Sequence, residues 1–264
     1  MRVITSNVHA DVDGWGRRTT AVLDTLAHAP DILFMQELWR GDEDDVARVA
    51  EVMGGDHAYV PLAHCWRVTG NSGGSGWEPL HGLLTGDRGL FFPQRRVLDA
   101  SRTRQLDASV GAQWGEWGVG LFARSGLDDI RLHDLIDRPR DKVNRRLITA
   151  STQMDGRDVA LVALHGAHLS HGSLIQYRDI RRIADEVAKG RPVIMAGDFN
   201  SWRPPLRTSL GSWRDAVRGK TWPAWMAHSQ IDHILYRGDF QISDPRVPRT
   251  GSDHRALICE MSLR

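Results

Sequence analysis

The chain has 264 residues, and its 34 lysines and arginines almost balance its 33 aspartates and glutamates, giving a formal net charge of +1 at pH 7. Hydrophobic residues make up 41% and charged residues 25%, which is typical of a folded globular protein and excludes an intrinsically disordered chain. The near-zero charge argues against a protein that holds nucleic acid by bulk positive charge alone. The two cysteines, Cys65 and Cys259, are too few for a disulfide framework or a four-thiolate zinc site.

Membrane and export signals are missing from the sequence pattern. No run of about 18 apolar residues predicts a transmembrane helix, and the first residues lack the apolar stretch of a signal peptide. Together with the small number of cysteines, this pattern predicts a cytoplasmic protein. Nothing in the sequence indicates an obligate protein partner.

The first part of the chain alternates predicted strands and helices. Residues 2–8 are β-rich, and residues 17–28 carry apolar side chains at helical spacing and end before Pro30. Residues 31–37 indicate a buried strand that finishes at Glu37, and residues 42–53 indicate a second helix. The acidic run at 42–45 suits the N-terminus of that helix, where the macrodipole favours negative charge, better than it suits a metal site.

From about residue 64 to residue 117 the periodic pattern disappears. The tract at 69–76 is rich in Gly and Ser, and four of the ten tryptophans fall in the stretch, at positions 66, 77, 114 and 117. A loop this long in a compact domain is usually functional or disordered; an insertion with short strands, such as residues 89–92, is the alternative. No linker divides the chain, so we expect a single domain over residues 1–264.

Regular elements return after this stretch. Strands are predicted at 118–124, 146–153 and 158–165, and an Asp-Gly turn between the last two indicates a hairpin. A helix at 174–188 precedes a buried strand at 192–197 that leads into Asp198. The last predicted strands cover residues 231–236 and 255–261.

Polar side chains repeatedly follow apolar strands. A strand end is where a rigid scaffold presents a side chain to a cleft, and so many acids, amides and histidines suggest convergence on a metal and a phosphate. Mg²⁺ takes oxygen ligands, usually with only one or two protein carboxylates. The residues concerned are Asn7, Glu37, His168, Asp198, Asn200, Asp232, Asp253 and His254.

These residues stand in motifs that resemble a known family. Ser6-Asn7, Gln36-Glu37, His168-Leu169, Gly197-Asp198-Phe199-Asn200 and Ser252-Asp253-His254 follow the order of the endonuclease/exonuclease/phosphatase superfamily. That superfamily includes DNase I-like nucleases, abasic-site endonucleases, sphingomyelinases and inositol-polyphosphate phosphatases. The resemblance runs from Asn7 to about Glu260, and no family motif falls in the 64–117 stretch.

The resemblance implies a DNase I-like α/β (α+β) fold. Two mixed β-sheets would pack as a four-layer sandwich flanked by helices, with the cleft at one end. It also implies hydrolysis of a phosphate ester that depends on Mg²⁺ or Mn²⁺. By the same resemblance Glu37 is the principal metal ligand, Asn7 assists at the metal or at a phosphate oxygen, and Asp253 is a second candidate ligand.

The remaining roles are also implied by the resemblance. Asp198 positions or deprotonates the attacking water, and Asn200 orients the water or the phosphate. His254 contacts the phosphate or acts as acid or base, and Asp232 matches the aspartate that orients it. His168 matches the first catalytic histidine of DNase I-like and sphingomyelinase members, whereas abasic-site endonucleases carry Tyr there. An aspartate paired with His254 would raise its pKa and fix its tautomer.

Each of these residues has a structural alternative. Asn7 could cap a turn, Glu37 could begin a helix at the surface, Asp198 with Asn200 could form an Asx-turn, and His254 could be a surface histidine. A functional role is favoured for Glu37, Asp198, Asn200 and His254, because they end apolar strands or stand in a motif. For Asn7 a functional and a structural role stay equally open. Arg146, on a strand that leads toward the cleft, is a candidate phosphate contact with equally open odds.

The histidines at 165, 168 and 171 are spaced as zinc ligands sometimes are. If the strand that contains His165 continues, alternation places His165 and His168 on opposite sides, and no cysteine is near in sequence. A zinc site is therefore disfavoured, and His165 and His171 are interpreted as loop or supporting residues.

The sequence leaves the substrate open. A nuclease needs stacking and basic groups at its cleft, and candidates are the four tryptophans above with arginines at 95, 96, 102, 104, 145 and 146. Those tryptophans could equally pack under the long loop. A nuclease acting on DNA or RNA is favoured, and a lipid phosphodiesterase or a phosphatase is the alternative. A non-catalytic binding module is disfavoured because the predicted catalytic residues are all present.

Overall fold

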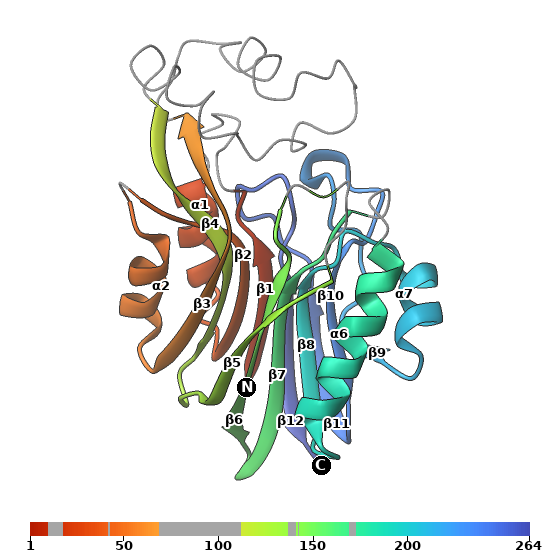
Figure 1. Ribbon diagram of the computed structural model, residues 1–264. Helices are drawn as coiled ribbons and strands as arrows, with labels where there is room; N and C mark the ends of the chain where they lie inside the picture. The colour runs from red at the N-terminus through yellow and green to blue at the C-terminus, as the bar shows by residue number, and fades with distance from the viewer. Residues whose placement is uncertain (10–17, 42, 69–111, 137–140, 142, 169–172) are drawn as a thin grey trace.

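Two six-stranded mixed sheets stack face to face in the computed structural model (Figure 1). The structure describes residues 1–9, 18–41, 43–68, 112–136, 141, 143–168 and 173–264. Helices cover the outer face of each sheet, so the layers run helix, sheet, sheet, helix, which confirms the predicted four-layer sandwich.

The first sheet has the strand order β11-β12-β1-β2-β4-β3. β1 and β2 run parallel, with Val3 opposite Ile32, and the other neighbours in this sheet are antiparallel. The strands are β1 (Arg2–Asn7), β2 (Ile32–Arg40), β3 (Asp56–Val68), β4 (Ala112–Ala123), β11 (Phe240–Arg246) and β12 (Leu257–Leu263).

The second sheet has the strand order β5-β6-β7-β8-β10-β9. β7 and β8 are parallel, and α6 connects them as the crossover that a parallel pair requires. The strands are β5 (Asp128–Asp134), β6 (Arg146–Met154), β7 (Arg157–His165), β8 (Val193–Asp198), β9 (Arg214–Asp215) and β10 (Asp232–Arg237).

The helices pack by their apolar faces. α1 (Arg18–Leu26) and α2 (Asp45–Met53) lie on the first sheet, and α6 (Ser173–Ala188) and α7 (Arg203–Leu210) lie on the second. Asp44 caps α2, because its side chain accepts a hydrogen bond from the backbone N–H of Ala47 at 2.9 Å. A short 3₁₀ helix, η2 (Ala224–Met226), precedes β10.

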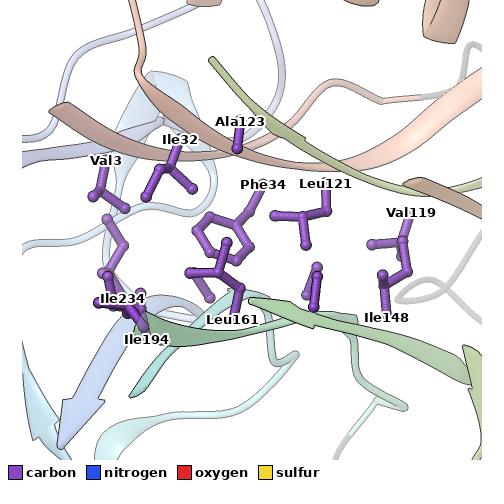
Figure 2. Packing of buried hydrophobic residues seen from close by; sticks show 14 of the residues in the cluster. Val3, Ile32, Phe34, Val119, Leu121, Ala123, Ile148, Leu161, Ile194 and Ile234 are labelled. Carbon is purple, nitrogen blue, oxygen red and sulfur yellow. The ribbon is translucent and has the colours of Figure 1, made fainter. Parts of the chain in front are cut away.

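The largest apolar cluster fills the space between the sheets. Figure 2 shows Phe34 and Leu121 of the first sheet facing Leu161 and Ile194 of the second. Each of these side chains is fully buried. Two further clusters lie between a sheet and its helices. The inner faces of the strands are thus close-packed, and a polar side chain buried there needs a hydrogen-bonding partner, as Thr5 and Gln36 provide for each other.

The irregular stretch expected at 64–117 is narrower than predicted. Residues 64–68 belong to β3 and residues 112–117 belong to β4, which pair in antiparallel register. The alternating pattern of β4 is hard to recognise in the sequence, because its glycines contribute no side chain to either face of the sheet. Gly118 is required by packing, since a Cβ there would lie 2.1 Å from the Val60 carbonyl oxygen. The residues between, 69–111, lie outside the described part of the chain.

Several elements were not predicted. The sequence pattern does not indicate β5, β11, α7 or the first half of β3, which are short or carry mixed polar and apolar residues. The hairpin of β6 and β7 is confirmed, with Met154 paired to Arg157. In the described residues, no helix has the length and apolar character that crossing a membrane requires.

Candidate active site

Strand alternation gathers polar side chains at one end of the sandwich. Asn7 continues the inner face that Val3 begins on β1, and His165 continues that of Leu161 on β7. Asp198 on β8 and Asp232 on β10 likewise share the side of inner-facing apolar residues. Each is the first or last residue of its strand. The close-packed core therefore delivers four buried polar side chains to one place.

Glu37 reaches the same place through a β-bulge. The pairing of β2 with β4 shifts register between Gln36 and Leu38, and Glu37 at the bulge has a φ of 63°. Simple alternation would turn Glu37 toward the helices, and the bulge re-aims it. A left-handed glutamate costs on the order of 1–3 kcal/mol, and such strain is concentrated at functional sites.

The Asn7 amide holds two carboxylates together. Its Nδ2 donates to Glu37 Oε1 and to Asp198 Oδ2, each at 3.1 Å. Its Oδ1 accepts the backbone N–H of His9 at 3.0 Å. Asn7 and Asp198 are 191 residues apart in sequence, so this contact joins the two sheets. In this arrangement the amide nitrogen, and not the amide oxygen, faces the carboxylates.

Asp198 is buried against another acid. Burial and the negative charge of Asp232 raise its pKa to about 7, although His254 and hydrogen bonds from Asn200 and Asn7 oppose the shift. The backbone N–H of Asn200 donates to its Oδ1 at 2.7 Å. A carboxyl group with a pKa near neutrality can exchange a proton at physiological pH.

His254 and Asp232 form a buried pair. His254 Nδ1 lies 2.9 Å from Asp232 Oδ2, and its Nε2 lies 3.9 Å from Asp198 Oδ2. Burial alone would lower the pKa of His254, but Asp232, Asp253 and Asp198 outweigh it and hold the pKa well above its ordinary value. Asp232 therefore accepts from Nδ1–H, fixes the ring orientation and favours the protonated ring, so that Nε2–H points into the site.

The histidine at the end of β7 is His165, which the sequence analysis interpreted as a supporting residue. Its Nε2 lies 3.5 Å from Asp198 Oδ2 and 3.1 Å from Asn200 Nδ2. Burial, with Arg145 and His254 nearby, places its pKa well below the ordinary value, so the ring is neutral. His168, predicted for this role, lies three residues beyond the strand and is half-buried. The shared parity of residues 161, 163 and 165 was the signal that would have identified His165.

Asp253 lies beside a second histidine that the sequence analysis did not single out. His9 Nδ1 is 3.5 Å from Asp253 Oδ1 and 3.9 Å from Glu37 Oε2. Trp222 Nε1 and the Ser252 hydroxyl donate to the Asp253 carboxylate at 3.4 and 3.2 Å. Burial would raise the pKa of Asp253, but His254, His9 and these two donors together lower it.

Arg146 does not join this group. It pairs with Asp134 across the β5–β6 ladder at 2.7 Å, on the exposed edge of the sheet. The preceding residue, Arg145, is the one that turns toward the site. It pairs with Asp141 at 2.8 Å and donates to the His165 carbonyl at 3.5 Å. Sequence periodicity could not separate two adjacent arginines at the start of a strand.

Three large apolar side chains stand exposed on segments that adjoin or contact these residues. Trp202 is 54% exposed and follows Asn200 by two positions. Trp225 and Met226, on η2, are 58% and 70% exposed. η2 is tied to the Asp253 backbone, because the Ala224 N–H donates to the Asp253 carbonyl at 2.6 Å.

The tryptophans expected at the cleft have different outcomes. Trp117 packs against His165, with the two ring centroids 5.6 Å apart. Trp66 and Trp114 lie on β3 and β4, where only the backbone is described. Trp77 and the arginines at 95, 96, 102 and 104 lie outside the described residues, as does His171.

One group of potential metal ligands is compact. The ligand atoms of Asp198, Asp232 and His254 lie within 4.8 Å of one another, and all three residues are buried. Since His254 and Asp232 are already hydrogen-bonded to each other, part of this compactness reflects their pairing. The cluster is a possible metal site.

Comparison with known proteins gives a consistent picture. The sequence model described as the endonuclease/exonuclease/phosphatase family matches residues 4–254. A UPF0294 protein of Yersinia pestis is 30% identical over 121 residues, which cover 43% of this chain and 46% of that protein. A UPF0294 protein of Vibrio cholerae is 30% identical over 120 residues, covering 41% of this chain and 42% of its own length. The chain thus matches a little under half the length of these relatives.

Solved structures share the fold at low sequence identity. The human Nocturnin catalytic domain with bound sulfate superposes with a TM-score of 0.67 at 17% identity, covering 100% of this chain and 94% of that one. An endonuclease/exonuclease/phosphatase from Beutenbergia cavernae gives 0.64 at 20% identity, covering 100% and 71%. Mannosyl-6-phosphatase of Bacteroides thetaiotaomicron gives 0.60 at 17% identity, covering 100% of both chains.

Proposed function

The chain belongs to the endonuclease/exonuclease/phosphatase family, and on that premise we propose that it is a divalent-metal-dependent hydrolase of phosphate esters. Residues 1–264 would act as one catalytic domain. The observation that carries the proposal is the continuous buried network from Asn7 through Asp198 and His254 to Asp232. A network of titratable groups with opposed pKa shifts is typical of an active site.

The donor chemistry fits a divalent cation. The carboxylates of Glu37, Asp198, Asp232 and Asp253 converge on one region, and the first three are almost completely buried. Several buried carboxylates together are costly unless positive charge accompanies them. Glu37 and Asp253 supply the oxygen ligands that Mg²⁺ or Mn²⁺ takes, and Asn7 would orient Glu37. A bound cation would neutralise phosphate charge and stabilise the transition state.

The protein groups account for the proton transfers of hydrolysis. A water oxygen forms a bond to phosphorus as the bond from phosphorus to the leaving oxygen breaks. Asp198, with its pKa near 7, accepts a proton from that water, and Asn200 with neutral His165 orients the phosphate. Protonated His254 donates its Nε2 proton to the leaving oxygen. A proton then passes from Asp198 to His254, which are 3.9 Å apart, and restores both groups.

A phosphodiester of DNA or RNA is the substrate that we favour. Trp202 presents an exposed ring two residues after Asn200, and Trp225 presents another on η2, whose Ala224 N–H donates to the Asp253 carbonyl. An aromatic face stacks on any nucleobase for about 1–3 kcal/mol. Stacking can substitute for bulk positive charge in a chain whose net charge is only +1. The same exposed rings with Met226 would also suit a lipid surface, so lipid phosphodiester hydrolysis is the second candidate.

Hydrolysis of bis-p-nitrophenyl phosphate tests the reaction class. We expect activity with Mg²⁺ or Mn²⁺, loss with EDTA, and loss in His254→Ala. His57→Ala, an exposed histidine on β3, is the matched control and keeps full activity. Activity that survives both EDTA and His254→Ala would contradict the proposal.

Parallel assays decide the substrate. Supercoiled plasmid nicking is compared with hydrolysis of sphingomyelin and phosphoinositide vesicles at equal enzyme concentration. We expect nicked plasmid. Intact plasmid in Mg²⁺, Mn²⁺ and Ca²⁺, together with cleaved lipid, would replace the nuclease with the lipid enzyme.

A further inference from the structure

The two members of the buried pair come from different sheets. Asp232 begins β10 of the second sheet, whereas His254 lies in the loop that leads into β12 of the first sheet. Among the described residues, the edge of β10 that faces away from β8 has strand partners only at Leu235 and Tyr236. Strand pairing on that edge therefore stops short of Asp232, and another element must hold Asp232 and His254 at their 2.9 Å contact.

Thr221 lies against this unpaired edge of β10. It is fully buried, and its Oγ1 accepts the backbone N–H of Ile231 at 3.2 Å and that of Asp232 at 3.3 Å. A hydroxyl oxygen has two lone pairs and can accept both bonds. The N–H of Thr221 donates to the Ser229 carbonyl at 2.8 Å, which fixes the threonine against the residues that lead into β10.

The backbone carbonyl of Thr221 holds the segment that carries the histidine. It accepts the N–H of Arg255, the residue after His254, at 2.8 Å. The Arg255 guanidinium donates to the Ala224 carbonyl through Nε and Nη2 at 3.0 and 2.9 Å, and the Ala224 N–H donates to the Asp253 carbonyl. One residue thus contacts the backbone of both segments, through two different oxygens.

We propose that Thr221 is a positioning residue for the buried pair: its hydroxyl places Asp232, its carbonyl places His254, and the two side chains then meet in hydrogen-bonding geometry. The inference rests on the proposed function, in which His254 donates a proton to the leaving oxygen. Thr221 acts through Asp232 and His254, not on the substrate. The reaction is sensitive to its loss because a misplacement of about 1 Å can cost about 100-fold in rate.

Thr221→Val tests the inference with little change of shape. Valine removes the acceptor of two buried N–H groups and keeps the backbone carbonyl. We expect kcat for bis-p-nitrophenyl phosphate to fall by about 10–100-fold, the upper end being the cost of a misplacement of about 1 Å. KM should stay nearly unchanged, because His254 acts in the transition state. Thr221→Ser restores the acceptor and should recover most of the wild-type kcat.

Thr152→Val is the matched control. Thr152 is also almost completely buried, and its hydroxyl donates to the Gly126 carbonyl at 2.7 Å. It pairs with Val159 on β7, away from the His165 end of that strand. This variant should lose stability in urea unfolding and keep the wild-type kcat.

The ring protons of His254 give a readout that needs neither metal nor turnover. A ring N–H that donates to a buried carboxylate makes a charge-assisted hydrogen bond, and its proton resonates far downfield. The signal is measured by NMR on the full chain with ¹⁵N-labelled histidine, in EDTA at one fixed neutral pH, and is assigned by its loss in His254→Asn. We expect it to move upfield or to be lost by exchange in Thr221→Val, to return in Thr221→Ser, and to be unmoved in Thr152→Val.

The outcomes separate this inference from the proposed function. Wild-type protein without metal-dependent hydrolysis would overturn the proposed function and the inference that rests on it. An active wild type, with a folded Thr221→Val that keeps both its kcat and the His254 signal, overturns the inference alone. So does an equal loss of kcat in Thr221→Val and Thr152→Val, or a failure of Thr221→Ser to recover activity. Thr221→Cys, whose sulfur is only a weak acceptor, replaces Thr221→Val if the valine variant does not fold.

Discussion

Replacing Asp198 by Asn should stabilise the folded protein at neutral pH while abolishing its activity. The pKa of Asp198 rises from 3.8 to about 7 on folding, chiefly because burial disfavours its charge. Keeping it ionised in the folded state at pH 7.5 therefore costs about 4 kcal/mol at roughly 1.4 kcal/mol per pKa unit. An amide of the same shape carries no charge and escapes this cost.

The substitution also removes one hydrogen-bond acceptor. Asp198 accepts hydrogen bonds from the Asn200 backbone at 2.7 Å and from Asn7 Nδ2 at 3.1 Å, on its two different oxygens. Asparagine has one oxygen and leaves one of these buried donors without its acceptor, which costs about 1–3 kcal/mol. The net stabilisation at pH 7.5 is then about 1–3 kcal/mol, against a total stability on the order of 5–15 kcal/mol for a domain.

The sign of the pH dependence is the sharper test. Because the folded pKa of Asp198 lies above its unfolded value, its contribution to stability is fully present below pH 3.8 and is lost as the pH rises through about 7. The stability difference between Asp198→Asn and wild type should grow by about 1.4 kcal/mol per pH unit, or about 2 kcal/mol from pH 4.5 to pH 6. The raised pKa of His254 acts above pH 6.5, so it does not enter this window.

Urea unfolding followed by tryptophan fluorescence, in EDTA, measures the difference. Asp128→Asn is a matched control, since that carboxylate is exposed on β5, away from the network. A difference between Asp198→Asn and wild type that stays constant from pH 4.5 to pH 6, or shrinks as the pH rises, would refute the reasoning that burial holds Asp198 in its protonated form.

Three further predictions concern turnover. His165→Ala should lower kcat for bis-p-nitrophenyl phosphate by about 10²–10³-fold, as expected for the loss of one group that stabilises the reacting phosphate, whereas His168→Ala should stay near wild type, and the reverse order would return the role to His168. Asp232→Asn should lower the pKa of His254, because Asp232 raises it, and so move the alkaline limb of the pH–rate profile to lower pH; an unmoved limb would exclude His254 as the acid. Trp225→Ala should raise KM for an oligonucleotide by about 5- to 150-fold, from roughly 1–3 kcal/mol of stacking, without changing KM for bis-p-nitrophenyl phosphate, and equal changes for both would indicate a structural effect.

Much of the site could be predicted because its residues end apolar strands. Asp198 follows five buried residues of β8, and Asp232 precedes a buried run on β10. A strand that is apolar to its last residue must end at the rim of the core, so a polar residue there is exposed to the cleft or paired within it. Position alone, however, did not show that Arg146 pairs with Asp134.

The assignment of His168 illustrates what local pattern cannot decide. Three histidines, at positions 165, 168 and 171, stand within seven residues at the end of the apolar run of β7. Only the point at which β7 ends decides which of them faces the site. Strand pairing sets that end, since His165 lies opposite Asp198 in the parallel register of β7 and β8. That register depends on a segment more than 30 residues away in the chain.

By itself, the sequence determined that the chain folds, that its strands alternate with helices, and which acids, amides and histidines stand at strand ends. Those properties depend on hydrophobic periodicity and short motifs, which are local. Only the tertiary structure decided that a bulge turns Glu37 inward, that Asn7 bonds to Asp198 across 191 residues, and that His9 lies beside Asp253. The reason is physical: burial and pairing between the two sheets fix how distant strands align, and that alignment places each side chain to within the few ångströms on which the chemistry depends.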